Sequence, residues 1–260
     1  MCCPGRTPAT SRTLRAACAV GAKSTTSPSR NSATFLTEEP RPIVRFPPPP
    51  IAWPVQRVLG ACPEAARLDA PLGRVLLERR SIRRLSAPSV REVLALVGMV
   101  TMNRLVKAGD PFARSRRVSP SAGALHPVSI VVLRGGRARA TALRVDPVGA
   151  HVQLLREREP GGAARLLTRL PQYLPQARGT MLVLLADRQL TAAAYRSPDS
   201  LLWRDAGALL ATLQITAAGL GLGTCLLGLL GHEVARSLFP SGNRIVAVGA
   251  CVVGRPTPPA

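Results

Sequence analysis

The most informative stretch for the fold is Arg117-Val-Ser-Pro-Ser-Ala-Gly-Ala-Leu-His-Pro127. In it two prolines bracket small residues, and a β-rich run from Val128 to Leu133 follows directly. The prolines fix the course of the loop, and the small side chains let its backbone come close to a flat ligand. An ordinary tight connection would use the same residue types. The loop is therefore a candidate binding element that needs support from other parts of the chain.

A basic run, Glu78-Arg-Arg-Ser-Ile-Arg-Arg84, lies upstream of this loop. It lies at the end of a short helix that is expected to run through Val75 to Arg80 and that Asp69 can cap. The C-terminus of a helix repels anions, so an anion here would have to be bound by side chains. Arginine forks and a serine hydroxyl suit a phosphate. A solvated basic surface would have the same composition.

The third motif belongs to a long helix expected from Ser200 to Leu220, which carries Asp205-Ala-Gly207 in its first turns. Alanine and glycine fill its interior and suit close helix packing, either in a core or between subunits. The segment Gly221-Leu-Gly223 ends the helix. It is not a dinucleotide fingerprint, because its glycines close a helix and do not open one after a strand. They either let the backbone approach a cofactor or simply cap the helix.

The remaining pattern is that of a mixed α and β domain with helices covering a sheet. A helix is expected from Val90 to Met102 after Ser89, and the continuous apolar run from Thr180 to Leu185 indicates a central strand. Further expected elements are a hairpin of Ala140–Val145 and His151–Leu155, a helical segment Leu167–Tyr173 and a strand Ile245–Val253.

Residues 1–50 are rich in Arg, Pro and Ser. They are predicted to be a disordered tail, or a translated stretch upstream of the true start, with an extended strap at Pro47–Pro50. Residues 51–260 are predicted to form the domain.

The net charge of +21 raises the question of nucleic-acid binding, but the sequence favours another origin. Lys23 and Lys107 are the only lysines, and the arginines are spread along the chain, as codon bias in a GC-rich genome would produce. Aromatic residues make up 3%, too few for stacking platforms. The six cysteines show no zinc spacing, and their usage fits a reducing compartment. No apolar stretch is long enough for a membrane span. We therefore expect a cytoplasmic protein without a specific nucleic-acid or membrane partner.

Together, and in this order, the three motifs resemble those of the nitroreductase superfamily. The R-R-S-x-R run, the P-S-A-G-A-L-H-P loop and D-A-G on a helix ending in G-L-G match over roughly residues 68–256. The loop is particularly similar to that of the SagB-type branch, the thiazoline/oxazoline dehydrogenases. The hairpin Leu143-Arg-Val-Asp-Pro-Val-Gly-Ala-His-Val-Gln-Leu154 also resembles the Y-D-x-x-x-H-x-L segment of that branch.

This resemblance implies an α+β, nitroreductase-like fold with a central, mainly antiparallel sheet flanked by helices. It also implies FMN at the interface of a homodimer, with the long helix in that interface. The matching residues fall into a phosphate and ribityl group, a ring-lining group and a group that completes the pocket. They are, respectively, Arg79, Arg80, Ser81 and Arg83; Pro120, Ser121, Ala122 and Gly123; and Gly221, Leu222, Gly223 and Arg255, with His126 and Arg204 as further candidates.

The reaction that the resemblance implies is a two-electron transfer, in which a hydride passes between a small-molecule or peptide substrate, or NAD(P)H, and the flavin. The azoline-oxidising members share a Lys-Tyr pair just before the long helix. Here Tyr195 matches the tyrosine and is the candidate catalytic residue, but Ala194 stands at the lysine position. An arginine, as at position 196, stays protonated and cannot act as the base. A packing role is the alternative for Tyr195. The second functional hypothesis is a non-catalytic subunit of nitroreductase fold in a peptide-modifying biosynthetic complex.

Overall fold

The computed structural model describes residues 39–43, 45–64, 67–135 and 140–258. They belong to the second of two compact units, residues 35–260, and the first unit, residues 1–34, lies outside the described part. The predicted tail is therefore described only from residue 39. That part contacts the domain, because β1 (Arg41–Pro42) pairs with β10 (Tyr195–Arg196) and the carbonyl oxygen of Pro49 accepts a hydrogen bond from Arg244 at 2.7 Å.

The centre of the fold is an eight-stranded sheet in which every described strand pairing is antiparallel. Seven strands follow the order β11-β12-β9-β6-β7-β8-β2, and β3 pairs with the end of β12. The strands are β2 (Val55–Ala61), β3 (Leu85–Ser86), β6 (Val128–Gly135), β7 (Ala140–Asp146), β8 (His151–Leu155), β9 (Thr180–Asp187), β11 (Gly223–Leu227) and β12 (Ile245–Pro256). A separate short ribbon pairs β4 (Leu105–Val106) with β5 (Ser115–Arg116).

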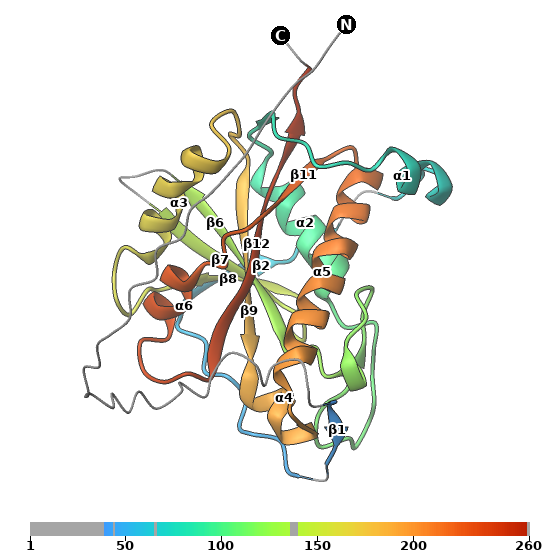
Figure 1. Ribbon diagram of the computed structural model, residues 1–260, viewed down its shortest axis with the longest axis vertical. Helices are drawn as coiled ribbons and strands as arrows, with labels where there is room; N and C mark the ends of the chain where they lie inside the picture. The colour runs from blue at the N-terminus through green and yellow to red at the C-terminus, as the bar shows by residue number, and fades with distance from the viewer. Residues whose placement is uncertain (1–38, 44, 65–66, 136–139, 259–260) are drawn as a thin grey trace, which may run out of the picture. The chain divides into compact units, whose positions relative to one another are not determined.

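Helices cover both faces of the sheet (Figure 1). On one face lie α2 (Val90–Thr101) and α5 (Asp199–Gly219), and on the other α3 (Gly162–Tyr173) and α6 (His232–Leu238). Two short helices, α1 (Leu72–Glu78) and α4 (Arg188–Ala194), lie at opposite ends of α5. The predicted α+β architecture, a mainly antiparallel sheet flanked by helices, is confirmed.

Strand β9 shows how the sequence encodes this layering. Met181, Val183 and Leu185 pack in the core under α3 and α6, whereas Leu182 and Leu184 pack under α2 and α5. All five side chains are at most 1% exposed. A strand with both faces covered has no polar side, so it reads as an unbroken apolar run. The prediction of a central strand here is confirmed.

The start of α2 is also as predicted. The hydroxyl of Ser89 accepts a hydrogen bond from the amide of Glu92 at 3.2 Å, and the Glu92 carboxylate accepts one from the amide of Ser89 at 2.8 Å. This capping box satisfies two backbone donors that the helix leaves unpaired. Glu92 also accepts a hydrogen bond from Arg255 at 2.8 Å. The hydrogen bonds from Ser89, and then the contact with Arg255, lower the pKa of Glu92.

Glu92 should make the stability of the fold sensitive to acid. Because its pKa is lower in the folded than in the unfolded chain, its contribution is complete above the ordinary value of 4.5 and is lost as the pH falls through the folded value. Glu92→Gln keeps the shape and does not titrate. We expect wild type to exceed this variant in free energy of unfolding at pH 7 by about 0.3–1 kcal/mol, the usual worth of an exposed negative charge near a helix N-terminus. Urea denaturation at pH 3 should show a smaller difference, and an equal difference at both pH values would contradict the assignment.

Several elements differ from the sequence-based expectation. Helix α1 begins after Pro71 without a side-chain cap, so the prediction that Asp69 caps it is wrong; Asp69 instead lies near the exposed Arg67. The fixed φ of Pro71 suits the start of a helix without any cap. Helix α3 begins at Gly162, before the expected segment, and β2 and α6 were not predicted.

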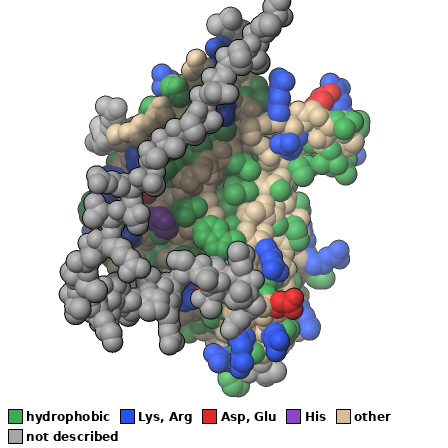
Figure 2. All heavy atoms as spheres, in the orientation of Figure 1, with side chains coloured by type: hydrophobic (Ala, Val, Ile, Leu, Met, Phe, Trp, Pro, Cys, Tyr) green, Lys and Arg blue, Asp and Glu red, His purple; other side chains and the backbone are tan. Residues whose placement is uncertain are grey.

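No helix in the described part of the chain is long and apolar enough to cross a membrane. On the face drawn in Figure 2, basic side chains are spread around the rim with few acidic ones between them, and they do not gather into a single stripe. On this face the basic side chains are thus dispersed, as they are in the sequence.

Candidate active site

The C-terminal end of α5 borders a cavity of about 840 Å³. Its walls come from α1 and the basic run after it, from the last turns of α5, and from the connection between α5 and β11. A volume of this size is typical of sites for cofactors and small molecules. The lining residues that matter below are Arg79, Arg80, Gln214, Gly221, Leu222 and Gly223.

Gln214 is the most informative residue in this cavity. Its side-chain oxygen accepts a hydrogen bond from the Arg79 guanidinium at 3.0 Å, which holds Arg79 against α5. Its side-chain nitrogen is buried and has no partner in the structure. A buried donor without an acceptor is costly, so it indicates a polar ligand atom at this place. Two guanidiniums beside an unsatisfied amide donor fit an oxygen-rich, anionic group such as the phosphate and ribityl chain of FMN. The sequence pattern gave no sign of Gln214.

The structure brings part of the predicted phosphate group together. Arg79 and Arg80 line the cavity with Gly221, Leu222 and Gly223, whereas Ser81, Arg83 and Arg255 are not among its lining residues. Ser81 forms a parallel bridge with Thr224. Burial raises the pKa of the Cys225 thiol, and Arg83 lies close enough to oppose that effect. Arg255 bonds Glu92 at the start of α2.

The glycines of the G-L-G segment have different local reasons. Gly221 follows the last turn of α5 with φ +72°, a conformation that glycine adopts without strain, and a Cβ there would meet nothing within 4 Å. At Gly223 a Cβ would lie 2.8 Å from the Leu85 side chain and 3.1 Å from that of Ile82. Gly221 therefore leaves open space beside the cavity, and Gly223 lets the basic run pack against β11.

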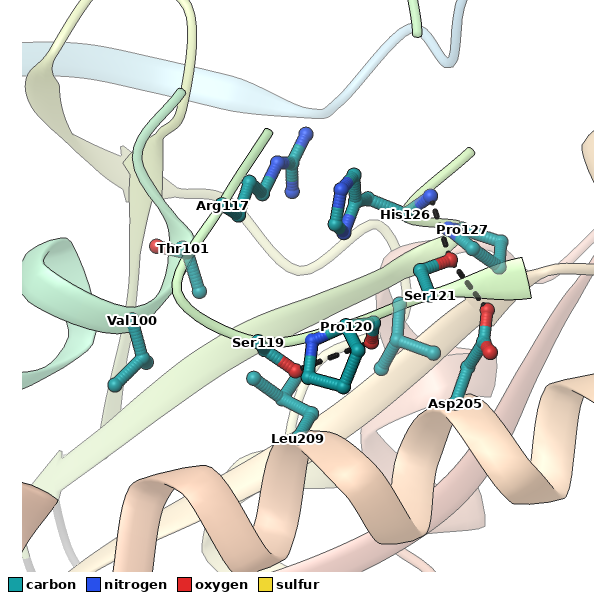
Figure 3. Close-up of a pocket in the computed structure, with 11 residues that line it drawn as sticks. Val100, Thr101, Arg117, Ser119, Pro120, Ser121, His126, Pro127, Asp205 and Leu209 are labelled. Atoms are coloured by element: carbon teal, nitrogen blue, oxygen red, sulfur yellow. Dashed lines mark hydrogen bonds between the residues drawn. The ribbon is translucent and has the colours of Figure 1, made fainter. Parts of the chain in front are cut away.

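The P-S-A-G loop lies near the other end of α5 and is anchored there by Asp205 (Figure 3). The Asp205 carboxylate accepts hydrogen bonds from the Ser121 hydroxyl at 2.5 Å and from the Ala122 amide at 2.9 Å. The Ser121 hydroxyl in turn accepts one from the amide of His126 at 2.9 Å. Burial raises the pKa of Asp205, and these hydrogen bonds oppose that effect. Asp205 thus fixes the loop conformation, a role that its place in the D-A-G motif did not reveal.

His126 lies at the end of this loop and is neutral at physiological pH. Its Nε2 lies 2.8 Å from the carbonyl oxygen of Ser115. Burial, and then the positive charge of Arg117, lower its pKa to about 4. Gly123, Ala124 and His126 all have positive φ, so the loop is tightly wound. A small cavity of about 20 Å³ beside it is lined by Pro120, Ser121, His126 and Asp205, and Arg204 lines neither this cavity nor the larger one.

Tyr195 lies directly against the P-S-A-G loop. A Cβ built on Gly123 would be 2.6 Å from the Tyr195 hydroxyl oxygen, while the ring carbons would be 3.5 Å away. The structure therefore brings the candidate catalytic residue and the candidate ring-lining loop into contact. It also explains why position 123 needs a glycine, both for its φ of +57° and for the space that the hydroxyl occupies.

This contact predicts a specific double-mutant result. Gly123→Ala should lower the free energy of unfolding by about 1–3 kcal/mol, because the new methyl group overlaps the Tyr195 hydroxyl. In a Tyr195→Phe background the same substitution should cost clearly less, since only ordinary contacts at 3.5 Å remain and the strain of positive φ persists. Urea unfolding of the four proteins measures the coupling. Equal costs in both backgrounds would show that the hydroxyl does not occupy this space.

The two halves of the predicted site are far apart within one chain. Asp205 anchors the P-S-A-G loop, while Gln214 and Ala218 border the arginine-lined cavity. At 1.5 Å per residue, Asp205 and Ala218 are separated by about 20 Å along α5. Gln214 is nine residues from Asp205 and lies about 14 Å from it along α5, so the arginine-lined cavity and the P-S-A-G loop are separate places on one chain.

Comparison with known proteins identifies the family of this chain. A family model described as the Nitroreductase family matches residues 76–255, well over half of the sequence. The chain belongs to the nitroreductase family. No curated protein matches it.

Two solved structures described as nitroreductases have a similar fold. One described as a nitroreductase from Ralstonia eutropha JMP134 is 17% identical, with a TM-score of 0.56 over 85% of this chain and 100% of its own. Another, from Anabaena variabilis, is 18% identical, with a TM-score of 0.57 over 77% of this chain and 42% of its own. A structure described as a nitroreductase in complex with FMN, from Desulfovibrio desulfuricans, is 20% identical, with a TM-score of 0.43 over 73% of this chain and 88% of its own. The first two likenesses show the fold alone.

Proposed function

We propose that this nitroreductase-family chain is an FMN-dependent oxidoreductase that transfers a hydride between a small-molecule or peptide substrate and its flavin. The observation that carries the proposal is the cavity at the end of α5, where Arg79 and Arg80 accompany the unpartnered amide nitrogen of Gln214. Bound there, the flavin would supply the two-electron chemistry. Arg79 and Arg80 would hold its phosphate, and Gln214 would donate a hydrogen bond to one of its oxygens.

The proposed working form is a homodimer with α5 in the interface. A two-fold axis crossing α5 would set the P-S-A-G loop of one subunit beside the arginine-lined cavity of the other. The dimer would then have two complete sites, each built from both subunits. The exposed side of α5 carries Trp203, Gly207 and Ala211 at helical spacing, and a Cβ on Gly207 would meet nothing within 4 Å. Helix α1 exposes Leu72 and Leu77, which are 65% and 90% accessible. Apolar side chains in such numbers beside a small-residue helix face favour a partner.

Within the family, the motif evidence favours the SagB-type branch and an azoline-containing peptide or a natural-product intermediate as substrate. The P-S-A-G loop carries this preference, and Tyr195 lies against it. With Ala194 at the lysine position, Tyr195 would act without the second member of the Lys-Tyr pair. NAD(P)H is the proposed alternative source of the hydride.

The direct test is the visible spectrum of the purified full chain, with the released chromophore identified by chromatography and the mass of the particle measured by sedimentation. We expect a yellow dimer with close to one FMN per subunit. A folded protein that stays colourless and takes up no added FMN would overturn the flavin proposal. A yellow monomer would overturn the placement of the site between subunits.

The second candidate is a non-catalytic subunit of a peptide-modifying complex, favoured by Ala194 at the lysine position. It predicts a folded dimer without flavin that binds an unmodified precursor peptide. Reduction of the bound FMN by NADPH or by an azoline peptide, followed as bleaching of the yellow colour, would exclude it.

A further inference from the structure

A second large cavity, of about 810 Å³, lies away from the arginine end of α5. Its walls are the Pro47–Pro50 strap, the turn of the β7–β8 hairpin, and the segment that carries β4 and β5. The flavin proposal does not use this space, although the end of the P-S-A-G-A-L-H-P stretch and the matched hairpin both contribute to its lining. It is lined by charged groups and by an apolar set that includes Trp53, Val106, Phe112, Leu125 and Leu190.

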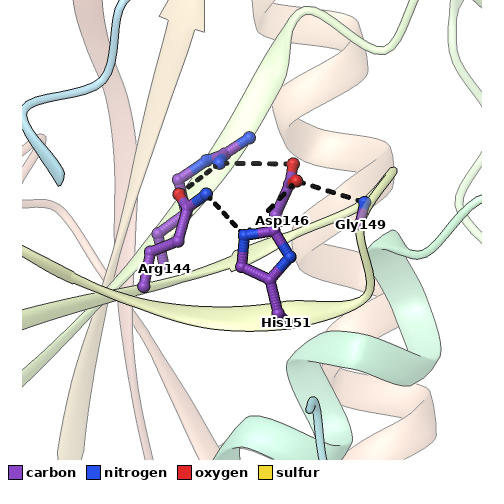
Figure 4. A network of polar contacts seen from close by, with 5 residues as sticks. Arg144, Asp146, Gly149 and His151 are labelled. Atoms are coloured by element: carbon purple, nitrogen blue, oxygen red, sulfur yellow. Dashed lines mark hydrogen bonds and ion pairs between the residues drawn. The ribbon is translucent and has the colours of Figure 1, made fainter. Parts of the chain in front are cut away.

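A polar network on the β7–β8 hairpin holds Arg144, one of the residues that line this cavity (Figure 4). Arg144 donates to the side-chain oxygen of Gln153 at 2.8 Å and lies 3.5 Å from the carboxylate of Asp146. Gln153 in turn contacts His151 at 3.0 Å, and Asp146 accepts a hydrogen bond from the amide of Gly149. The Arg144 side chain is 9% exposed, and its buried Nε has no partner. The network thus fixes a buried guanidinium and leaves one of its donors unused.

A second guanidinium faces the same space without a carboxylate of its own. Arg117 donates to the side-chain oxygen of Asn103 at 3.0 Å, which is a neutral acceptor. Burial, and then repulsion from Arg144, lower its pKa to about 10, against the attraction of Asp146. Two positive charges therefore lie close together around one carboxylate.

The charges around the cavity do not balance. Three guanidiniums and two carboxylates line it, and Arg244 and Asp187 form a closed bidentate pair with contacts of 2.7 and 3.0 Å. His126, also in the lining, has its pKa lowered to about 4 and is neutral. Arg117, Arg144 and Asp146 are left with one positive charge in excess. A buried charge without a counterion is costly, so the site is complementary to one negative charge.

We propose that this cavity binds an organic carboxylate, with the carboxylate on Arg117 and Arg144 and an apolar body against the aromatic and aliphatic wall. A carboxylate matches the planar arginine fork, and its single charge matches the excess. The volume is typical of a small-molecule site. Arg117 and His126 also line the small cavity beside Ser121 and Asp205, so an occupant would lie next to the end of the P-S-A-G loop that carries His126. The inference does not rest on the flavin proposal.

The test uses isothermal titration of the full chain with 3-phenylpropionate, after saturation with FMN so that the arginine end of α5 is not available to the probe. The comparison probes are 3-phenylpropionamide, which keeps the body and removes the charge, and phenyl phosphate, which keeps the aromatic ring, shortens the linker and replaces the carboxylate by a phosphate. The matched variants are Arg117→Gln and Arg116→Gln, because Arg116 is exposed, next in sequence and outside the cavity lining.

We expect the carboxylate to bind at least tenfold more tightly than the amide and more tightly than phenyl phosphate. Arg117→Gln should remove this preference while Arg116→Gln keeps it, and both variants should unfold at similar urea concentrations. No measurable binding of the carboxylate, an equal affinity for the amide, or binding that survives Arg117→Gln would overturn the proposal. Tighter, Arg117-dependent binding of phenyl phosphate would overturn the assignment to a carboxylate. If the protein takes up no FMN, the same titration on the flavin-free chain tests this site separately.

Discussion

Arg79→Ala should release FMN from the protein, with a dissociation constant about 10- to 150-fold above that of wild type. The expected magnitude follows from losing a charged hydrogen bond to a phosphate, worth about 1.5–3 kcal/mol, at about 1.4 kcal/mol per factor of ten. Arg79 is the residue to change because it lines the cavity and is held there by Gln214 at 3.0 Å. Quenching of flavin fluorescence on titration of the flavin-free protein measures the effect.

Two comparisons make this result specific. Arg91→Ala removes the same charge from an exposed position of α2 outside the cavity lining, and should leave the affinity unchanged. The family resemblance assigns Arg83 to the phosphate, whereas the structure does not place it in the cavity lining. Weaker FMN binding by Arg83→Ala would support the resemblance, and unchanged binding would support the geometry. If folded Arg79→Ala protein bound FMN with wild-type affinity, the phosphate would not bind in this cavity.

Most of the layered architecture could be predicted from local patterns. The unbroken apolar run of β9 and the Ser89 cap before α2 each carry their signal within a few neighbouring residues. The start of helix α3, in contrast, could not be predicted from the residues next to it. Its first turn is stabilised by the Glu157 carboxylate, which accepts hydrogen bonds from the amides of Gly161 and Ala163 at 2.7 and 2.6 Å. A cap supplied from upstream in the chain leaves no Ser, Thr or Asp at the helix start to be recognised.

The candidate site was predictable in its residue types and not in its contacts. The arginines after α1 and the small residues of the P-S-A-G loop suggest a ligand site by composition, although a solvated surface and an ordinary tight connection would use the same residue types. The residues that position them do so from far away in sequence, because Asp205 bonds Ser121 across 84 residues and Gln214 bonds Arg79 across 135. No local pattern encodes such pairs, and only the packing of α5 against the sheet brings them together.

Asp187 lies in the lining of the second cavity. Asp187→Ala should be the most destabilising substitution there, lowering the free energy of unfolding by about 3–5 kcal/mol. Its buried carboxylate accepts hydrogen bonds from the amides of Gln189 and Leu190 at the start of α4, and both of its oxygens bond the Arg244 guanidinium. Removing it leaves Arg244, whose side chain is 23% exposed, without its counterion and leaves α4 without its cap. A loss of this size is a large part of the total stability of an ordinary domain.

The order of the variants tests that explanation. Arg244→Ala should cost less than Asp187→Ala, because the carboxylate keeps its two amide donors, although the carbonyl of Pro49 loses its donor. The double variant should be no less stable than Asp187→Ala alone, since the uncompensated guanidinium is then gone. Urea unfolding gives these free energies, provided that the slope of the free energy of unfolding against urea concentration is the same in all variants. If Arg244→Ala proved the more damaging, the arginine would matter mainly by fastening the strap over the second cavity, and the charge pair at the end of β9 would be secondary.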